Sequence, residues 1–218
     1  MLRFVKEMGF AALMVVGAMS ARGQERPVPS VRYVGIEDGL SNNAVTGVYQ
    51  DYKGFMWFTT YDGLNRYDGR SFTIFRNRIG DSSSLKGNEV YCIADDLWHN
   101  LWVGGRNGLS VYHPDRGAFS VPSYAPPAGG VPRPVSSEVV NVDRDGRGDM
   151  LCGDGGTGLL VFAKGDSVGR QVKLASGPVN YKVSAVCQDS SDGTTSADRG
   201  ECGTLSLLVE GTGDKGCQ

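Results

Sequence analysis

The chain repeats itself, and the spacing of the repeat limits the folds that it can adopt. Trp57 and Trp102 lie 45 positions apart, and the Gly-Leu pairs that end in Leu64 and Leu109 keep the same separation. A fixed period of about 40–50 residues, built from short apolar stretches, is typical of β-propeller blades and related arrays. The period therefore predicts an all-β protein made of propeller blades.

The spacing continues beyond the second copy and then ends. A third, weaker copy starts at Glu138 and has Leu151 where the second copy has Trp102, and a fourth starts at Val183. We therefore predict about three to four four-stranded blades within residues 24–193, from an incomplete propeller that is expected to have seven blades. After residue 193 the pattern stops, and we interpret 194–218 as an off-pattern tail that is either out of frame or disordered.

Each copy is predicted to form four short strands. Residues Val45–Asp51 alternate in polarity, and Phe55–Thr60 is apolar on both faces, as expected of a strand covered by a blade on each side. Asp-Gly pairs then predict tight turns. The remaining strands of the copy are predicted at Leu64–Tyr67 and Ser71–Phe75. A further strand is predicted at Val31–Gly35, where it is expected to complete a blade that these residues do not supply.

The N-terminus and the charge balance narrow the functional classes. Residues 1–23 combine a basic start, a short apolar run and small residues, which predicts a secretory signal peptide and a periplasmic location. A formal net charge of -2 gives no basic surface for nucleic acid. The five cysteines form no Cys-x-x-Cys pair, and the two histidines stand apart. We predict no metal site, no cofactor and no particular disulfide, with Cys92, Cys152 and Cys187 in strands.

The repeated residues resemble the two-component regulator propeller repeat, with its pattern Leu-x-x-Asn-x-Val, Asp-x-x-Gly-x-x-Trp and Gly-Leu-x-x-Tyr-Asp. His99 and His113 depart from this pattern, because they replace the usual Gly and Asp. We assign the repeated positions a structural role, with both tryptophans packed between blades. These positions are Asn43, Asp51, Trp57, Gly63, Leu64 and Tyr67 in the first copy and Asn88, Asp96, Trp102, Gly108, Leu109 and Tyr112 in the second.

The resemblance implies a sensing role. Propellers of this family form the periplasmic part of hybrid sensor histidine kinases, which are anchored in the inner membrane, and many respond to oligosaccharides. The 218 residues contain no kinase helix, ATP lid or receiver cluster, so the resemblance implies a sensor fragment without enzymatic activity of its own. The remaining blades, the membrane segment and the kinase domains would belong to a parent protein, which is expected to be a homodimer.

Two other functions compete with oligosaccharide sensing. A propeller that binds another protein and no small ligand would have much the same sequence. A propeller glycosidase or lyase would need a converging pair of carboxylates. The recurring acids Asp51, Asp96 and Asp145 occupy equivalent turns, which indicates a structural role and disfavours the enzyme.

The predicted ligand site lies on the turns between the second and third strands, which share one face of a propeller. Aromatic rings there could stack on a sugar, and polar side chains could bind its hydroxyls. The Gly-rich run 153–158 is followed by a strand, so a phosphate loop is excluded. Trp98 is placed on the opposite face, as a domain contact or a plug. The candidate ligand-binding residues are Tyr61, Asp62, Arg106, Asn107 and Asp154.

Overall fold

The structure is a computed structural model that describes residues 31–127, 129–172, 183, 185–188 and 205–208. The chain divides into two units, residues 1–33 and 34–218, and all the blades belong to the second. The predicted signal peptide, Cys202 and Cys217 lie outside the described residues. Within the described residues, strands predominate and the one helical element is the short 3-10 turn η1 (Ile36–Asp38).

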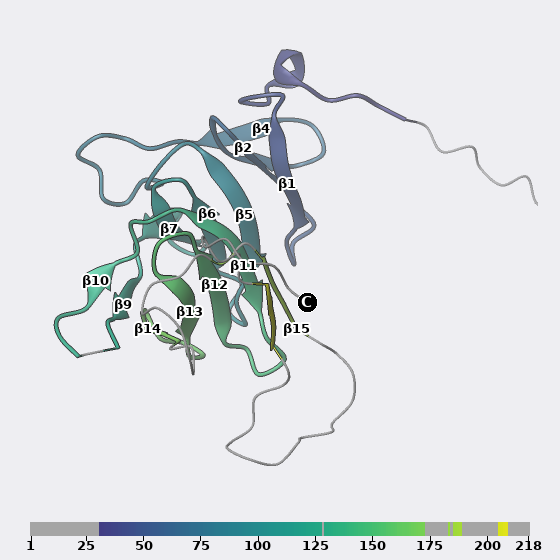
Figure 1. The fold of residues 1–218 in the computed structure, drawn as a ribbon. Coiled ribbons are helices and arrows are strands. Elements are labelled where there is room, and N and C mark those ends of the chain that lie inside the picture. The colour runs from purple at the N-terminus through teal and green to yellow at the C-terminus, as the bar shows by residue number, and fades with distance from the viewer. Residues whose placement is uncertain (1–30, 128, 173–182, 184, 189–204, 209–218) are drawn as a thin grey trace, which may run out of the picture. The chain divides into compact units, whose positions relative to one another are not determined.

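The first two copies of the repeat form two antiparallel blades, as predicted (Figure 1). In both, consecutive strands are neighbours in the sheet, so the chain runs up and down across each blade. Blade 1 consists of β1 (Val45–Gln50), β2 (Met56–Thr60), β3 (Gly63–Tyr67) and β4 (Phe72–Phe75). Blade 2 consists of β5 (Val90–Asp95), β6 (Leu101–Gly105), β7 (Gly108–His113) and β8 (Ala118–Ser120).

The third copy also forms a blade, but its sheet has two extra strands. The Pro-rich connector before it contributes β9 (Ser123–Ala125) and β10 (Arg133–Pro134). Strand β9 pairs in parallel with the last strand of blade 3 and so occupies an edge that would otherwise leave backbone groups unpaired. The regular strands of blade 3 are β11 (Val139–Arg144), β12 (Met150–Asp154), β13 (Gly158–Phe162) and β14 (Val168–Gln171).

The fourth copy is represented by a pair of strands. Strand β15 (Ala185–Gln188) lies where the repeat predicts the first strand of a fourth blade. Its antiparallel partner is β16 (Leu205–Leu208), which comes from the segment predicted to be an off-pattern tail, either out of frame or disordered. The paired backbone of these four residues does not fit disorder, and the out-of-frame alternative stays a prediction.

Two further expectations need correction. Residues Val31–Gly35 do not form the predicted strand: no described strand pairs with them, and the side chains of Val31 and Tyr33 are 75% and 90% exposed. Strand β2 is not covered on both faces. Trp57 is buried, whereas Met56 and Phe58, which point the other way, are only partly buried because no described blade packs on their side.

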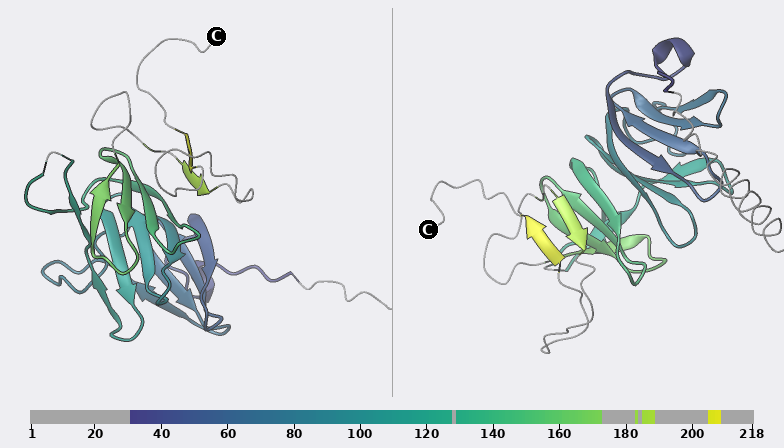
Figure 2. Two further views of the ribbon diagram at one scale, coloured as in Figure 1. Left: turned by 90° about the horizontal axis from the view of Figure 1, so that it is seen from below. Right: turned by 90° about the vertical axis from the view of Figure 1, so that its right-hand side faces the viewer.

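The blades pack face to face, and their first strands lie side by side (Figures 1 and 2). Strand β5 contacts β1 on one side and β11 on the other. Side chains tie these strands together. The Thr46 hydroxyl donates to the carbonyl oxygen of Val90 at 2.6 Å, and the Cys92 thiol donates to that of Val139 at 3.7 Å.

The hydrophobic core is divided into clusters that lie between successive blades, which confirms the predicted place of both tryptophans. Trp57 of blade 1 is 1% exposed and packs with Tyr112 and Phe119 of blade 2. Trp102 of blade 2 is 5% exposed and stacks edge-on against Phe162 of blade 3. In blade 3, the position of these tryptophans is taken by Leu151, which belongs to a third cluster made of Leu159, Val161 and Val183.

The repeated aspartate stabilises the turn before each second strand and holds the tryptophan. Asp51 Oδ1 accepts hydrogen bonds from the backbone N–H groups of Lys53 and Phe55, and its Oδ2 accepts one from Trp57 Nε1 at 2.8 Å. Asp96 repeats this arrangement in blade 2, with Trp102 Nε1 at 3.2 Å. The recurring acids are therefore structural, as their equivalence predicted.

The same turn requires a left-handed residue. Gly54 and Gly148 have φ values of 86° and 92°, and at the equivalent position of blade 2 His99 adopts a φ of 64°. Among the described residues, His99 is the one non-glycine residue with positive φ. It stacks on Tyr52 of blade 1, with ring centroids 3.9 Å apart, and its Nδ1 lies 3.4 Å from Asp95 Oδ2. These contacts offset the cost of the unusual backbone.

Candidate ligand-binding face

The turns between second and third strands carry the predicted site residues. Gly63 and Gly108 form these turns in blades 1 and 2 with φ values near 118°, which confirms their mechanical role. A side chain at Gly108 would collide with the carbonyl oxygen of Val135, so the turn packs tightly against the next blade. The turns therefore present Tyr61-Asp62 and Arg106-Asn107 as fixed pairs.

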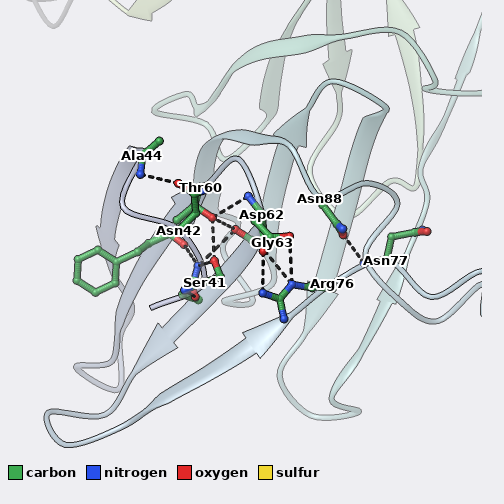
Figure 3. A network of polar contacts seen from close by, with 11 residues as sticks. Ser41, Asn42, Ala44, Thr60, Asp62, Gly63, Arg76, Asn77 and Asn88 are labelled. Carbon is green, nitrogen blue, oxygen red and sulfur yellow. Dashed lines mark hydrogen bonds and ion pairs between the residues drawn. The ribbon is translucent and has the colours of Figure 1, made fainter. Parts of the chain in front are cut away.

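In blade 1, the predicted site residue Asp62 is held by an arginine (Figure 3). The guanidinium of Arg76 donates from Nη2 to Asp62 Oδ2 at 2.8 Å and from Nε to Oδ1 at 3.2 Å. Both side chains are about 40% exposed, so the pair is available to solvent. Next to it, the amide oxygen of Asn88 accepts the backbone N–H of Asn77 at 2.7 Å. Asn43 accepts the backbone N–H of Ile36 in the same way, so the repeated asparagine fixes the segment that leads into each of the first two blades.

A second group joins blades 1 and 2 on the same face. Arg106 Nη1 donates to Glu89 Oε2 at 3.2 Å, and the Tyr91 hydroxyl donates to the same oxygen at 3.3 Å. The ring of Tyr61, which is 52% exposed, meets the ring of Tyr91 edge-on with centroids 6.2 Å apart. Four side chains from two blades therefore form one cluster with two aromatic rings and an ion pair.

The charges around Tyr91 extend the cluster to blade 3. Burial, with the negative charges of Glu138 and Glu89, raises the pKa of the Tyr91 hydroxyl. The hydrogen bond to Glu89 raises the pKa of Arg106, which stays charged. Sequence reasoning missed Glu89, Tyr91 and Glu138. The available signal was that both glutamates occupy the same repeat position, immediately before the first strand of a blade.

Besides Asp62, which pairs with Arg76, two of the predicted residues lie outside this cluster. Asp154 is fully buried, and its carboxylate accepts hydrogen bonds from the Ser137 hydroxyl and from the backbone N–H groups of Gly156 and Thr157. It stabilises its own turn and is removed from the ligand-binding set. Asn107 is exposed, with its side chain lying against Gly87. The structure therefore brings Tyr61 and Arg106 together with Tyr91 and leaves Asp154 out.

Groups that could hold a metal and helices that could span a membrane are both absent from the described residues. No group of three or more His, Cys, Asp or Glu side chains is placed to hold a metal ion within this part of the chain. Across the same residues, no helix is long and apolar enough to cross a membrane.

Comparison with known proteins agrees with the repeat. Residues 39–62 match the two component regulator propeller family. A stretch of 48 residues is 48% identical to a protein named histidine kinase P4 from Formosa agariphila and covers 22% of this chain but 4% of that one. The chain thus spans a small part of the length of this relative.

Solved structures share the fold. Two structures of the extracellular domain of one B. thetaiotaomicron protein, described as a one component and as a hybrid two component system, match with TM-scores of 0.62 and 0.63. Both are 17% identical to this chain, and the matches cover 84% and 85% of it but 25% of the domain. The chain thus carries a match to the two component regulator propeller family at residues 39–62, and its described residues fold as β-propeller blades.

Proposed function

We propose that this chain is the ligand-sensing part of a two-component signalling protein and acts in the periplasm. The match to the propeller repeat and the identity with a histidine kinase support the signalling role. The neighbours of known structure are extracellular domains, which supports a location outside the cytoplasm. In this proposal the chain binds and transmits, and the phosphotransfer chemistry belongs to other domains of the parent protein.

We further propose that the ligand is an oligosaccharide bound at the cluster of Tyr61, Glu89, Tyr91 and Arg106. The observation that carries this proposal is the convergence of two tyrosine rings and an ion pair from two blades. Aromatic rings cover the apolar faces of sugars, and carboxylates and guanidinium groups bind their hydroxyls. The exposed ring of Tyr61 leaves one aromatic surface open for such a contact.

Calorimetric titration of the purified chain with a panel of oligosaccharides tests this site. Tyr61→Ala and Arg106→Ala should each weaken binding of an oligosaccharide by about tenfold or more, as expected for the loss of a stacking or charged contact worth about 1.4 kcal/mol. Tyr52→Ala is the matched control, because Tyr52 is an equally exposed aromatic at 54% on a turn at the other end of blade 1. If Tyr52→Ala weakens binding as much as Tyr61→Ala, or if no oligosaccharide binds, the proposed site is wrong.

A further inference from the structure

A cavity of about 500 Å³ lies between blades 2 and 3, away from the turns that carry the predicted site. It is bounded by the β5–β6 turn and the segment after β8 in blade 2, and by the β11–β12 and β13–β14 turns of blade 3. Its volume is in the range that holds a small molecule. Apolar walls come from Trp102, Val111 and Met150, and polar ones from Asn100, His113 and Ser120.

The cavity exists because blade 2 departs from blade 1 at two positions. In blade 1, the guanidinium of Arg66 lies 4.9 Å from the ring of Phe55 and 5.9 Å from that of Trp57. Arg66 pairs with Trp57 across β2 and β3 in the same register in which Val111 pairs with Trp102. The shorter Val111 and Asn100, which replaces Phe55, leave the corresponding space of blade 2 empty.

The polar wall of the cavity is a connected chain of hydrogen bonds. Asn100 Nδ2 donates to Asp96 Oδ2 at 2.8 Å, which orients the Asn100 amide oxygen toward His113. His113 Nδ1 lies 3.0 Å from that oxygen and must therefore carry its proton. In the neutral ring, Nε2 is then an acceptor, and it lies 2.8 Å from the Ser120 hydroxyl. The chain holds Ser120 and His113 in fixed orientations at the cavity wall.

An aromatic side chain stands at the rim. Trp98 is 52% exposed and lines the cavity, with its ring close enough to Gly165 that an added Cβ there would approach it to 3.1 Å. A glycine thus gives the indole room to lie against the β13–β14 turn. The lining includes the carboxylates of Asp96 and Asp166 and no Lys or Arg. This charge pattern disfavours an anionic ligand.

The geometry points to a binding site for a neutral, hydroxyl-bearing ring, such as a single sugar residue of an oligosaccharide. The indole of Trp98 would cover one face of the ring, while the hydroxyl of Ser120 and the carboxylate of Asp166 would bind its hydroxyls. This inference shares the ligand class of the proposed function but places the ligand at a different site. The two sites are therefore tested by different variants.

The experiment uses the full chain and follows tryptophan fluorescence, because Trp98 and Trp102 both line the cavity. The probes are the neutral disaccharides maltose, cellobiose and lactose, together with glucose and its anionic counterpart glucuronate. We expect at least one neutral disaccharide to change the emission with a Kd below about 1 mM, and glucose to bind more tightly than glucuronate. No response to any neutral sugar, or a preference for glucuronate, would overturn the inference.

Two variants taken from blade 1 locate the site. Trp98→Lys introduces the residue that blade 1 has at this exposed position, Lys53, and should weaken binding at least tenfold without unfolding the chain. Asn100→Phe combined with Val111→Arg refills the cavity with the pair that blade 1 tolerates, and should abolish binding, with far-UV circular dichroism as the check on folding. Unchanged binding in Trp98→Lys refutes the inference even if the double variant does not fold.

Tyr61→Ala separates this site from the one on the opposite turns. If Tyr61→Ala leaves the affinity unchanged while Trp98→Lys weakens it, the cavity is the site and the location given under the proposed function fails. The reverse result overturns the cavity and supports the cluster around Tyr91.

Discussion

The repeated aspartate offers a test of how the blades are stabilised, because the chain contains its own control. Replacing Asp51, Asp96 or Asp145 by Asn keeps one side-chain oxygen. That oxygen can still accept hydrogen bonds from the backbone N–H groups of the turn. In blade 3, for example, Asp145 Oδ1 accepts them from Arg147 and Asp149 at 2.9 and 2.8 Å. The second oxygen becomes an NH₂ group. Only in blades 1 and 2 does this group face an indole N–H, since blade 3 has a leucine at the tryptophan position.

The expected costs follow from the lost contacts. A hydrogen bond to a charged acceptor contributes about 1.5–3 kcal/mol, so Asp51→Asn should destabilise the chain by about 1.5–2 kcal/mol. Asp96→Asn should cost more, because Asp96 is 6% exposed and its Oδ2 also accepts the Asn100 amide at 2.8 Å. Asp145→Asn should change the free energy of unfolding by no more than about 0.5 kcal/mol.

Urea denaturation followed by circular dichroism measures these differences as shifts of the midpoint at constant slope. A cycle of Asp51→Asn with Trp57→Phe isolates the indole contact: the second variant removes the N–H donor, so Asp51→Asn should then cost about 1 kcal/mol less. Equal costs for Asp51→Asn and Asp145→Asn would mean that the turn, and not the tryptophan, accounts for the effect. That result would refute the reasoning.

Two further predictions concern titratable groups that are partly or fully buried. Burial, with a hydrogen bond to Asp95, raises the pKa of Tyr49 in the folded state. The unfolded chain therefore loses this proton at a lower pH than the folded chain, and the free energy of unfolding falls as the pH rises above about 10. Tyr49→Phe should make this fall shallower when urea midpoints are plotted against pH. Parallel plots for the variant and the original chain would contradict the prediction. Burial raises the pKa of the Cys92 thiol to about 12 and also raises that of Cys152. At pH 8 both thiols should react with a thiol reagent only after unfolding, which peptide mapping by mass spectrometry would show. Rapid labelling of either thiol in the folded chain would contradict its burial between the blades.

The repeat predicted the fold well because its strongest residues have one physical purpose. Trp57 and Trp102 fill the spaces between blades, so their spacing gave the spacing of the sheets. The β9–β10 hairpin could not be predicted, since short Pro-rich segments lack a strand pattern and gain their pairing from the edge of β14. Residues Val31–Gly35 have a strand-like sequence, but they find no partner strand among the described residues.

The candidate site was harder to predict than the fold. Turn position correctly placed Tyr61 and Arg106 on one face, yet it could not show that Asp154 turns inward to its own backbone. The cavity beside Trp102 depends on volumes lost at Asn100 and Val111. Repeated residues do not point to these two positions, because the cavity forms where blade 2 differs from blade 1.

The three core clusters differ in chemistry, and this difference bears on how the chain avoids misassembly. The cluster between blades 1 and 2 has three aromatic side chains among eight buried residues, that between blades 2 and 3 has Trp102 and Phe162 among ten, and the third is aliphatic. Repeat proteins fail characteristically by pairing the wrong neighbours during folding. If blade 3 met blade 1 directly, the aromatic face of Trp57 would face the smaller partners that suit Trp102. Because the clusters differ, each blade packs well only against its own neighbour. Exchanging two blades along the chain should therefore slow folding of the chain more than it changes the stability of either blade alone.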